Sequence, residues 1–227
     1  MLSGFAIMNT CILFSQHHVD LSLSNGISRI SSVNSNEEEA MSRAKITDGQ
    51  NWSLNGGANY YYTIHKWNLE TGLTYSFIQG NTTEQFHVYT QTQGVDYDYE
   101  LNTNRKVHYL KIPVILNYRF DKLELGIGVY GAYRLTNSSW IKGYINSDPA
   151  IFQGGGNNLR KFDSGVICQL KYKLDAKYDF LIAANAGLID ISNGLEKGAP
   201  NFFFGFEAHQ RALKTRQLTI GLIYHLF

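Results

Sequence analysis

Charged side chains recur at alternate positions of otherwise apolar segments, and they are the first candidates for chemistry in this sequence. We interpret nine of them as facing the interior of the fold: Asp20, Glu70, Lys111, Arg119, Glu124, Arg134, Asp163, Lys171 and Lys173. Acids and bases occur on neighbouring segments, and buried charges need partners of opposite sign. We therefore expect an ion-paired polar network in the interior. A proton or ion path through that interior is the alternative.

Histidine and serine side chains raise a second possibility, nucleophilic catalysis. His108, His209 and many serines are available, but no His/Ser/acid arrangement stands out, and catalytic triads are recognised by geometry. His108 lies on an apolar face, which favours an interfacial role. Cys11 and Cys168 lack metal-ligand spacing, and the glycine run at 154–156 lacks the helix that phosphate binding needs. We expect no catalytic residue, no cofactor and no metal.

The composition favours an all-β protein. The 227 residues include 15 Tyr, 13 Phe and 21 Gly but only 3 Pro, a profile that suits strands and turns. The formal net charge is +1, and no stripe of Lys and Arg alternates with aromatic residues. We therefore do not expect the protein to bind nucleic acid.

Apolar and polar residues alternate with period two in eight segments, from 19–30 near the start to 218–227 at the end. Very short connections fall near residues 65, 121 and 177, whereas long ones cover about 31–50, 79–106, 136–161 and 190–213. Short turns at one end, long loops at the other and an even strand number are typical of outer-membrane barrels. The sequence therefore predicts an eight-stranded antiparallel up-and-down transmembrane β-barrel, with short periplasmic turns and long extracellular loops.

Aromatic residues near the segment ends agree with a membrane barrel, since they would form its interfacial girdles. They are Trp52, Tyr62, Trp67, Tyr118, Phe120, Tyr172 and Phe180. A soluble eight-stranded barrel with an aromatic core is the alternative. An eight-stranded barrel is just wide enough for side chains to fill it, so we expect no open pore.

The two ends of the sequence carry separate predictions. Residues 1–15 resemble a secretory signal peptide, although no Lys or Arg precedes the apolar run, and residues 16–227 would form the barrel domain. A frayed or buried N-terminal strand is the alternative. The last segment, LTIGLIYHLF, should pair with the strand at 19–30 so that no edge is left in lipid. Phe227 is out of phase with its apolar row, which predicts a bend or bulge there.

The long loops are where function is expected on such a scaffold. Phe202, Phe203, Phe204 and Phe206 form an aromatic cluster that would contact a partner, cap the barrel or extend a strand. The acidic run at 37–39 would be a solvated loop or a cation-bridged contact with lipopolysaccharide. The expected partners are outer-membrane lipid or lipopolysaccharide and another outer-membrane protein.

Four stretches resemble the small PorT-type outer-membrane β-barrel proteins of Bacteroidota. They are YLKIPVILNYRF (109–120), FDSGVICQLKYKL (162–174), GLIDIS (187–192) and the closing TRQLTIGLIYHLF. The resemblance spans roughly residues 16–227 and implies a multi-pass barrel in the cell outer membrane. None of these motifs is catalytic, so the leading hypothesis is a non-enzymatic structural or interaction protein at the cell surface. An accessory component of type IX secretion and gliding, and a lipid-A-modifying enzyme, are the alternatives.

Overall fold

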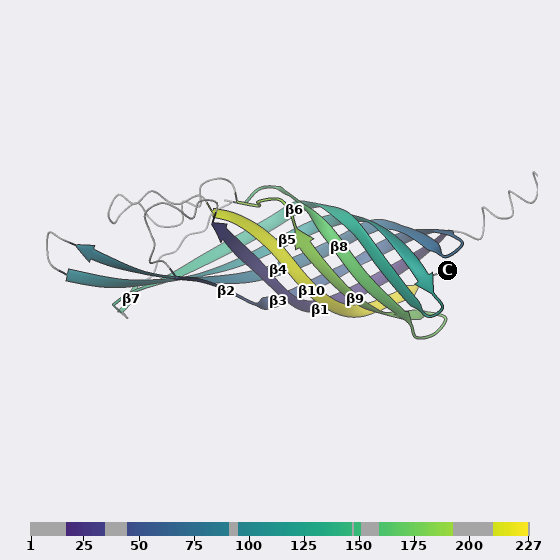
Figure 1. The fold of residues 1–227 in the computed structure, drawn as a ribbon, viewed down its shortest axis with the longest axis horizontal. Coiled ribbons are helices and arrows are strands. Elements are labelled where there is room, and N and C mark those ends of the chain that lie inside the picture. The colour runs from purple at the N-terminus through teal and green to yellow at the C-terminus, as the bar shows by residue number, and fades with distance from the viewer. Residues whose placement is uncertain are drawn as a thin grey trace, which may run out of the picture.

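The structure is a computed structural model that describes residues 17–34, 45–90, 95–146, 148–150, 159–192 and 211–226. Ten strands lie within these ranges (Figure 1): β1 (His17–Asn34), β2 (Lys45–Gly49), β3 (Asn51–Ile64), β4 (Trp67–Thr90), β5 (Val95–Phe120), β6 (Leu123–Ile145), β7 (Asp148–Ala150), β8 (Phe162–Lys173), β9 (Tyr178–Gly187) and β10 (Arg211–His225). Within these ranges, no helix has the length and apolar character needed to span a membrane.

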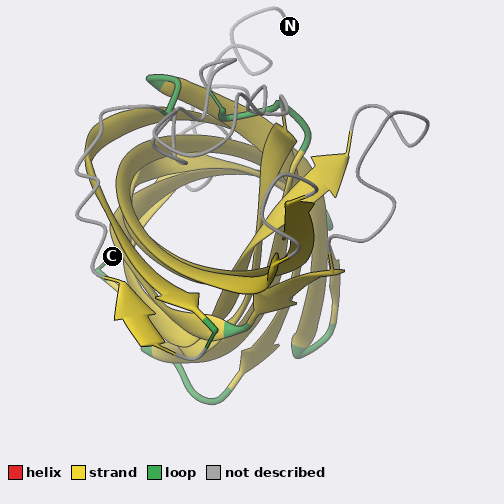
Figure 2. Ribbon diagram, turned by 90° about the vertical axis from the view of Figure 1, so that its left-hand side faces the viewer, coloured by secondary structure: helices red, strands yellow, loops and turns green. Residues whose placement is uncertain are grey.

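Eight of the strands close into an antiparallel barrel, as predicted. The ring runs β1, β3, β4, β5, β6, β8, β9 and β10, and Figure 2 shows it from one end. The first and last strands form the closing seam, with paired positions from Asp20 and His225 to Asn34 and Arg211. Two-residue turns join β3 to β4 and β5 to β6, and their first residues, His65 and Asp121, have positive φ values of 58° and 53°.

The facing of the side chains shows which solvent surrounds the barrel. Apolar side chains point outward, with Ile127 65% exposed and Leu23 62% exposed, whereas polar side chains such as Ser76 and Asn117 are fully buried inside. A water-soluble barrel has the opposite arrangement, so the outward row faces lipid. All seven predicted girdle aromatics lie on the outward rows, which excludes the alternative of an aromatic core built from them.

On several strands, the outward-facing residues change from apolar to polar at the same height along the barrel axis. Beyond Phe77, His108 and Leu218 the next outward residues are Gln79, Lys106 and Arg216. Along β5 the apolar row spans His108 to Phe120, which corresponds to about 30 Å of membrane depth at the usual strand rise and tilt. This height matches the hydrocarbon core of a bilayer.

The stretch 79–106, predicted as a long loop, is largely strand, and the predicted loops at 31–50 and 136–161 are partly strand. β4 and β5 stay paired beyond the lipid-facing rows, from Gln79 and Lys106 to Thr90 and Val95. β6 continues to Ile145, and the short strands β2 and β7 add to the edges of this sheet. The prediction of a loop at 79–106 was therefore wrong. The reason lies in the residues themselves, since Tyr, Thr, Val and Phe favour strands even where the stretch as a whole is polar.

Two irregularities interrupt the barrel ladders. Leu135 is an extra residue in β6, because Tyr109 pairs with Arg134 while His108 pairs with Thr136. Pro113 lies in β5 and lacks an N–H group, and the ladder from β5 to β4 has no pair at this residue.

The structure does not test two predictions made for the ends of the chain. The outward row of β10 continues regularly through Tyr224 and Leu226, and the Leu226 N–H donates to the Val19 carbonyl at 3.1 Å. Phe227 and the leader at 1–15 lie outside the described residues. The bend at Phe227 and the signal peptide therefore stay predictions.

Candidate functional site

The inner half of the barrel, next to the short turns, contains a charged cluster centred on Lys171. Its Nζ atom donates to Glu70 Oε2 at 2.7 Å, to Glu124 Oε1 at 3.1 Å and to the Tyr61 hydroxyl at 3.2 Å. These three acceptors use all three N–H bonds of the ammonium group. Lys171 also lies 4.5 Å from the centre of the Tyr61 ring, within range of a cation–π contact.

Side-chain amides and one guanidinium complete the same cluster. Glu70 Oε2 also accepts from Gln169 at 2.5 Å and from Asn117 at 3.1 Å. Glu124 Oε2 accepts from Asn68 at 2.5 Å and from Arg119 at 3.2 Å. Both buried carboxylates are thus hydrogen-bonded at several points, which is the condition for retaining charge away from water.

The middle of the barrel holds a second, weaker polar layer around Lys111. Lys111 donates to Gln217 Oε1 at 2.6 Å, and its Nζ atom lies 4.9 Å from the centre of the Tyr130 ring. No carboxylate of the described residues lies within ion-pair distance of it. Asp163 Oδ2 accepts from Thr215 at 2.9 Å and from Tyr130 at 3.3 Å. The opposite charges of this layer are therefore bridged through neutral groups.

A histidine-linked group lies at the inner mouth. His225 Nδ1 is 2.9 Å from Asp20 Oδ1, and His225 Nε2 is 3.2 Å from Asp179 Oδ1. His18 stacks on the Tyr61 ring at 4.5 Å between centroids and lies 3.8 Å from Asp20. This group joins β1, β10 and β9 where the barrel closes.

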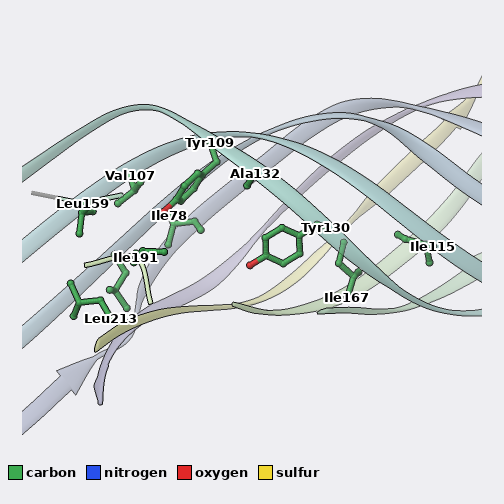
Figure 3. Close-up of a cluster of buried hydrophobic side chains, with 11 residues drawn as sticks. Ile78, Val107, Tyr109, Ile115, Tyr130, Ala132, Leu159, Ile167, Ile191 and Leu213 are labelled. Carbon is green, nitrogen blue, oxygen red and sulfur yellow. The ribbon is translucent and has the colours of Figure 1, made fainter. Parts of the chain in front are cut away.

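A cluster of apolar side chains lies in the outer half of the barrel, alongside the inward-facing Arg105 and Arg134. Figure 3 shows Val107, Leu159, Ile191 and Leu213 gathered together, apart from the deeper Ile115 and Ile167. Ile191 comes from the segment after β9, and its N–H donates to the Leu213 carbonyl at 2.9 Å. The residues just before β8 and just after β9 thus continue the hydrogen-bonded wall at the outer end, and the side chains of Leu159 and Ile191 are buried there.

Two polar side chains hold these inward segments in place. Asp190 accepts from the N–H groups of Ser192 and Leu213 at 2.9 and 2.7 Å, and Arg134 donates to the Leu159 carbonyl. Partial burial alone would raise the pKa of Asp190, but these hydrogen bonds and the nearby Arg160 outweigh it and hold that pKa below its ordinary value. Asp190 is therefore a charged acceptor at neutral pH.

Glycines on the inward rows show how tightly the interior is filled. A Cβ atom at Gly126 would lie 2.0 Å from the Asn117 side chain, and one at Gly80 would lie 2.7 Å from the Ile30 Cβ atom. The side chains of neighbouring strands occupy the space that these glycines leave. Inward side chains are therefore closely packed around these two glycines.

The nine charged residues predicted to face the interior do not form a single network. Glu70, Glu124, Lys171 and Arg119 come together, Lys111 and Asp163 belong to the middle layer, and Asp20 and Arg134 lie at opposite ends. Lys173 shares the inward phase but is exposed beside the turn after β8. The predicted patch of Phe202, Phe203, Phe204 and Phe206 lies outside the described residues.

Sequence reasoning missed the neutral and aromatic partners of these charges. Tyr61, Tyr109 and Tyr130 are buried inside, and His18 and His225 complete the inner mouth. The available signal was their phase, because each lies on the polar row of its strand.

Of the two histidines considered for catalysis, the structure describes one. His108 faces outward and bonds the Tyr75 hydroxyl at 2.5 Å, an interfacial pair. His209 lies outside the described residues. In the ranges that the structure describes, no three His, Cys, Asp or Glu side chains are arranged to hold a metal ion.

Solved structures similar to this chain are outer-membrane proteins. Neisserial surface protein A is 9% identical with a TM-score of 0.44, covering 91% of this chain and 96% of that one. The outer membrane protease OmpT from Escherichia coli is 12% identical with a TM-score of 0.39, covering 93% and 97%. Ail of Yersinia pestis is 11% identical with a TM-score of 0.28, covering 92% and 99%. No curated protein matches the chain.

The family assignment comes from a family model, which agrees with the barrel geometry described above. The model is described as "Outer membrane protein beta-barrel domain" and matches residues 14–193, well over half of the chain. The protein belongs to this family of outer-membrane β-barrels and is located in the outer membrane.

Proposed function

We propose that this protein is a non-enzymatic interaction protein whose filled barrel anchors an outer sheet that contacts surface ligands or partner subunits. The observation that carries the proposal is the continuation of β4 and β5 beyond the lipid-facing rows, through the pair Thr90 and Val95. Eleven residue steps separate Gln79 from Thr90, which corresponds to about 35 Å of strand. Anchoring in the bilayer does not require this extension.

The surface of the outer sheet supports contact with polar partners. Its exposed row carries hydrogen-bonded pairs, Thr83 with Asn102 at 2.6 Å and Gln85 with Glu100 at 3.0 Å. Glu100 also accepts from Asn102 at 2.8 Å. These cross-strand pairs stiffen the sheet, and a rigid polar surface loses little conformational entropy on binding.

The filled interior supports the view that the barrel is not an open pore. The charged inner cluster uses its own donors and acceptors, and apolar side chains close the outer end. A route for solutes would have to disrupt one of these layers.

The test is a variant in which residues 84–101 are replaced by Asn-Gly, so that Thr83 and Asn102 are joined by a tight turn that suits a hairpin. We expect this trimmed protein to insert and to show normal heat-modifiable gel mobility, because the barrel is intact. In the producing organism it should lose the cell-surface phenotype of the full chain. Full complementation by the trimmed protein would contradict the proposal.

The alternatives from the sequence give different outcomes in the same strains. If the partner is a type IX secretion machinery, deletion and trimming will both abolish cargo secretion. If the protein modifies lipid A, deletion will change the lipid A mass spectrum. We expect that spectrum to stay unchanged.

A further inference from the structure

The outward surface of the closing seam carries two arginines at directly paired positions. Arg29 on β1 is paired with Arg216 on β10. This pair lies two residues beyond the lipid-facing pair of Ile27 and Leu218, toward the outer end of the barrel. Like charges opposite each other on a sheet are destabilising unless an anion lies between them. Lys214 lies two residues further toward the outer end on β10 and adds a third cation.

Among the described residues, only part of this charge is compensated. Arg29 Nη2 lies 3.4 Å from Asp48 Oδ2, and the Arg29 Nε atom is buried without a hydrogen bond. Arg216 is exposed, and none of the ion pairs or hydrogen bonds formed among the described residues involves its side chain. Within the described residues, the Arg216 guanidinium therefore has no partner.

The depth of the pair identifies the kind of anion that can reach it. Arg29 and Arg216 lie where the outward rows turn from apolar to polar, and the exposed Trp52 lies beside Ile27 just below. Tryptophan at this position marks the headgroup level of the bilayer. Guanidinium groups bind phosphate through paired N–H bonds, so a lipid phosphate of the outer leaflet is within reach.

A second unusual residue lies below the arginines in the same column. Asn25 faces outward between Leu23 and Ile27, and it is the only carboxamide on the lipid-facing apolar rows of the described strands. Its amide takes part in none of the hydrogen bonds within the described part of the chain. Four residue steps separate it from Arg29, which places it about 10 Å deeper in the membrane.

An unpaired amide in hydrocarbon is costly, so its presence points to a polar group at that depth. We propose that the β1–β10 seam binds a phosphorylated lipid whose acyl chains carry hydroxyl, ester or amide groups, the chemistry of lipid A. Arg216, Lys214 and Arg29 hold the phosphate, and Asn25 bonds a polar group of an acyl chain. The bound lipid would thereby cover both strands of the seam.

The phosphate contact is tested by native mass spectrometry of the full chain in detergent, titrated with bisphosphorylated lipid A. We expect Arg216→Gln to lower the affinity about five-fold, the effect of one basic side chain at an anionic membrane surface. Lys106→Gln is the matched control, because Lys106 is an exposed cation at the same level on β5, away from the seam. Equal losses for the two variants, or none for either, would overturn the site.

Two further arms separate the lipid from its phosphate and test the amide. Inorganic phosphate at millimolar concentration should not displace lipid A, and displacement would mean that the seam binds free phosphate. Asn25→Leu should weaken lipid A about three-fold, the effect of one intramembrane hydrogen bond, while binding of phosphatidylglycerol with unsubstituted acyl chains stays unchanged.

Thr71→Val is the control for the amide, since Thr71 is a lipid-facing polar residue on β4. Unchanged lipid A affinity in Asn25→Leu, or an equal effect of Thr71→Val, would remove Asn25 from the site. Heat-modifiable mobility confirms in each case that the variant is folded.

Discussion

The two halves of the barrel interior are packed by different kinds of side chain. The inner half is held by buried charges, with Lys171 bound to Glu70 and Glu124, whereas the outer half is filled by Val107, Ile191 and other apolar side chains. The inner cluster is built entirely from barrel strands, so its geometry is fixed once the ring closes. The outer cluster also includes Leu159 and Ile191, which lie just beyond the ends of β8 and β9. Mutations can therefore perturb the charged inner cluster and the apolar outer cluster separately.

The inner cluster can be broken most severely by removing its cation. Lys171→Met leaves Glu70 and Glu124 close together in a buried site, and we expect a loss of about 3 kcal/mol or more in unfolding free energy. Urea titration of the refolded protein in lipid vesicles measures it. Lys173→Met is the matched control, because Lys173 is two residues away but exposed; a similar loss there would show that the cluster has no special role.

The outer closure can be broken by steric means. A Cβ atom at Gly80 would meet Ile30 at its Cβ and backbone nitrogen, at 2.7 and 2.8 Å. Gly80→Ala should therefore lower the unfolding free energy by about 1 to 3 kcal/mol, the usual cost of overpacking. Gly131→Ala provides the comparison, since a Cβ there would have no atom within 4 Å. Equal stability of the two variants would contradict the packing described for the outer end.

The smallest effect concerns the pH dependence of the outer closure. The pKa of Asp190 is below its ordinary value in the folded protein, so its stabilising contribution is complete above the ordinary carboxyl pKa of about 3.9 and is lost as the pH falls through the lowered value. Asp190→Asn should reduce the unfolding midpoint at pH 7, and the difference from the native sequence should shrink near pH 3 (about one unit below that ordinary pKa). A difference that persists undiminished in acid would show that the charge of Asp190 is not involved.

The architecture could be predicted from the sequence because two local signals specify it. Period-two alternation gives each strand its two faces, and the regular change from short to long connections orders the strands around a ring. The phase of each strand was enough to place Glu70, Lys111 and Lys171 inside. The extension of β4 and β5 could not be predicted from hydrophobic alternation, because both faces of this stretch carry polar residues.

The partners within the interior could not be predicted in the same way. Lys171 and Glu70 are 101 positions apart, and Lys111 and Gln217 are 106 apart. Which inward side chains meet depends on strand tilt and stagger, which the sequence does not state locally. Ile191 lies beyond the end of β9, so its burial could not be inferred from the alternation of a strand.

Planar-bilayer recording of the purified full chain tests most directly the claim that both halves of the interior are filled. With its charged inner cluster and its apolar outer closure intact, the protein should insert without producing discrete conductance steps. Long-lived steps of constant amplitude, in preparations shown to be folded by heat-modifiable mobility, would mean that an open path crosses the barrel and would contradict the account.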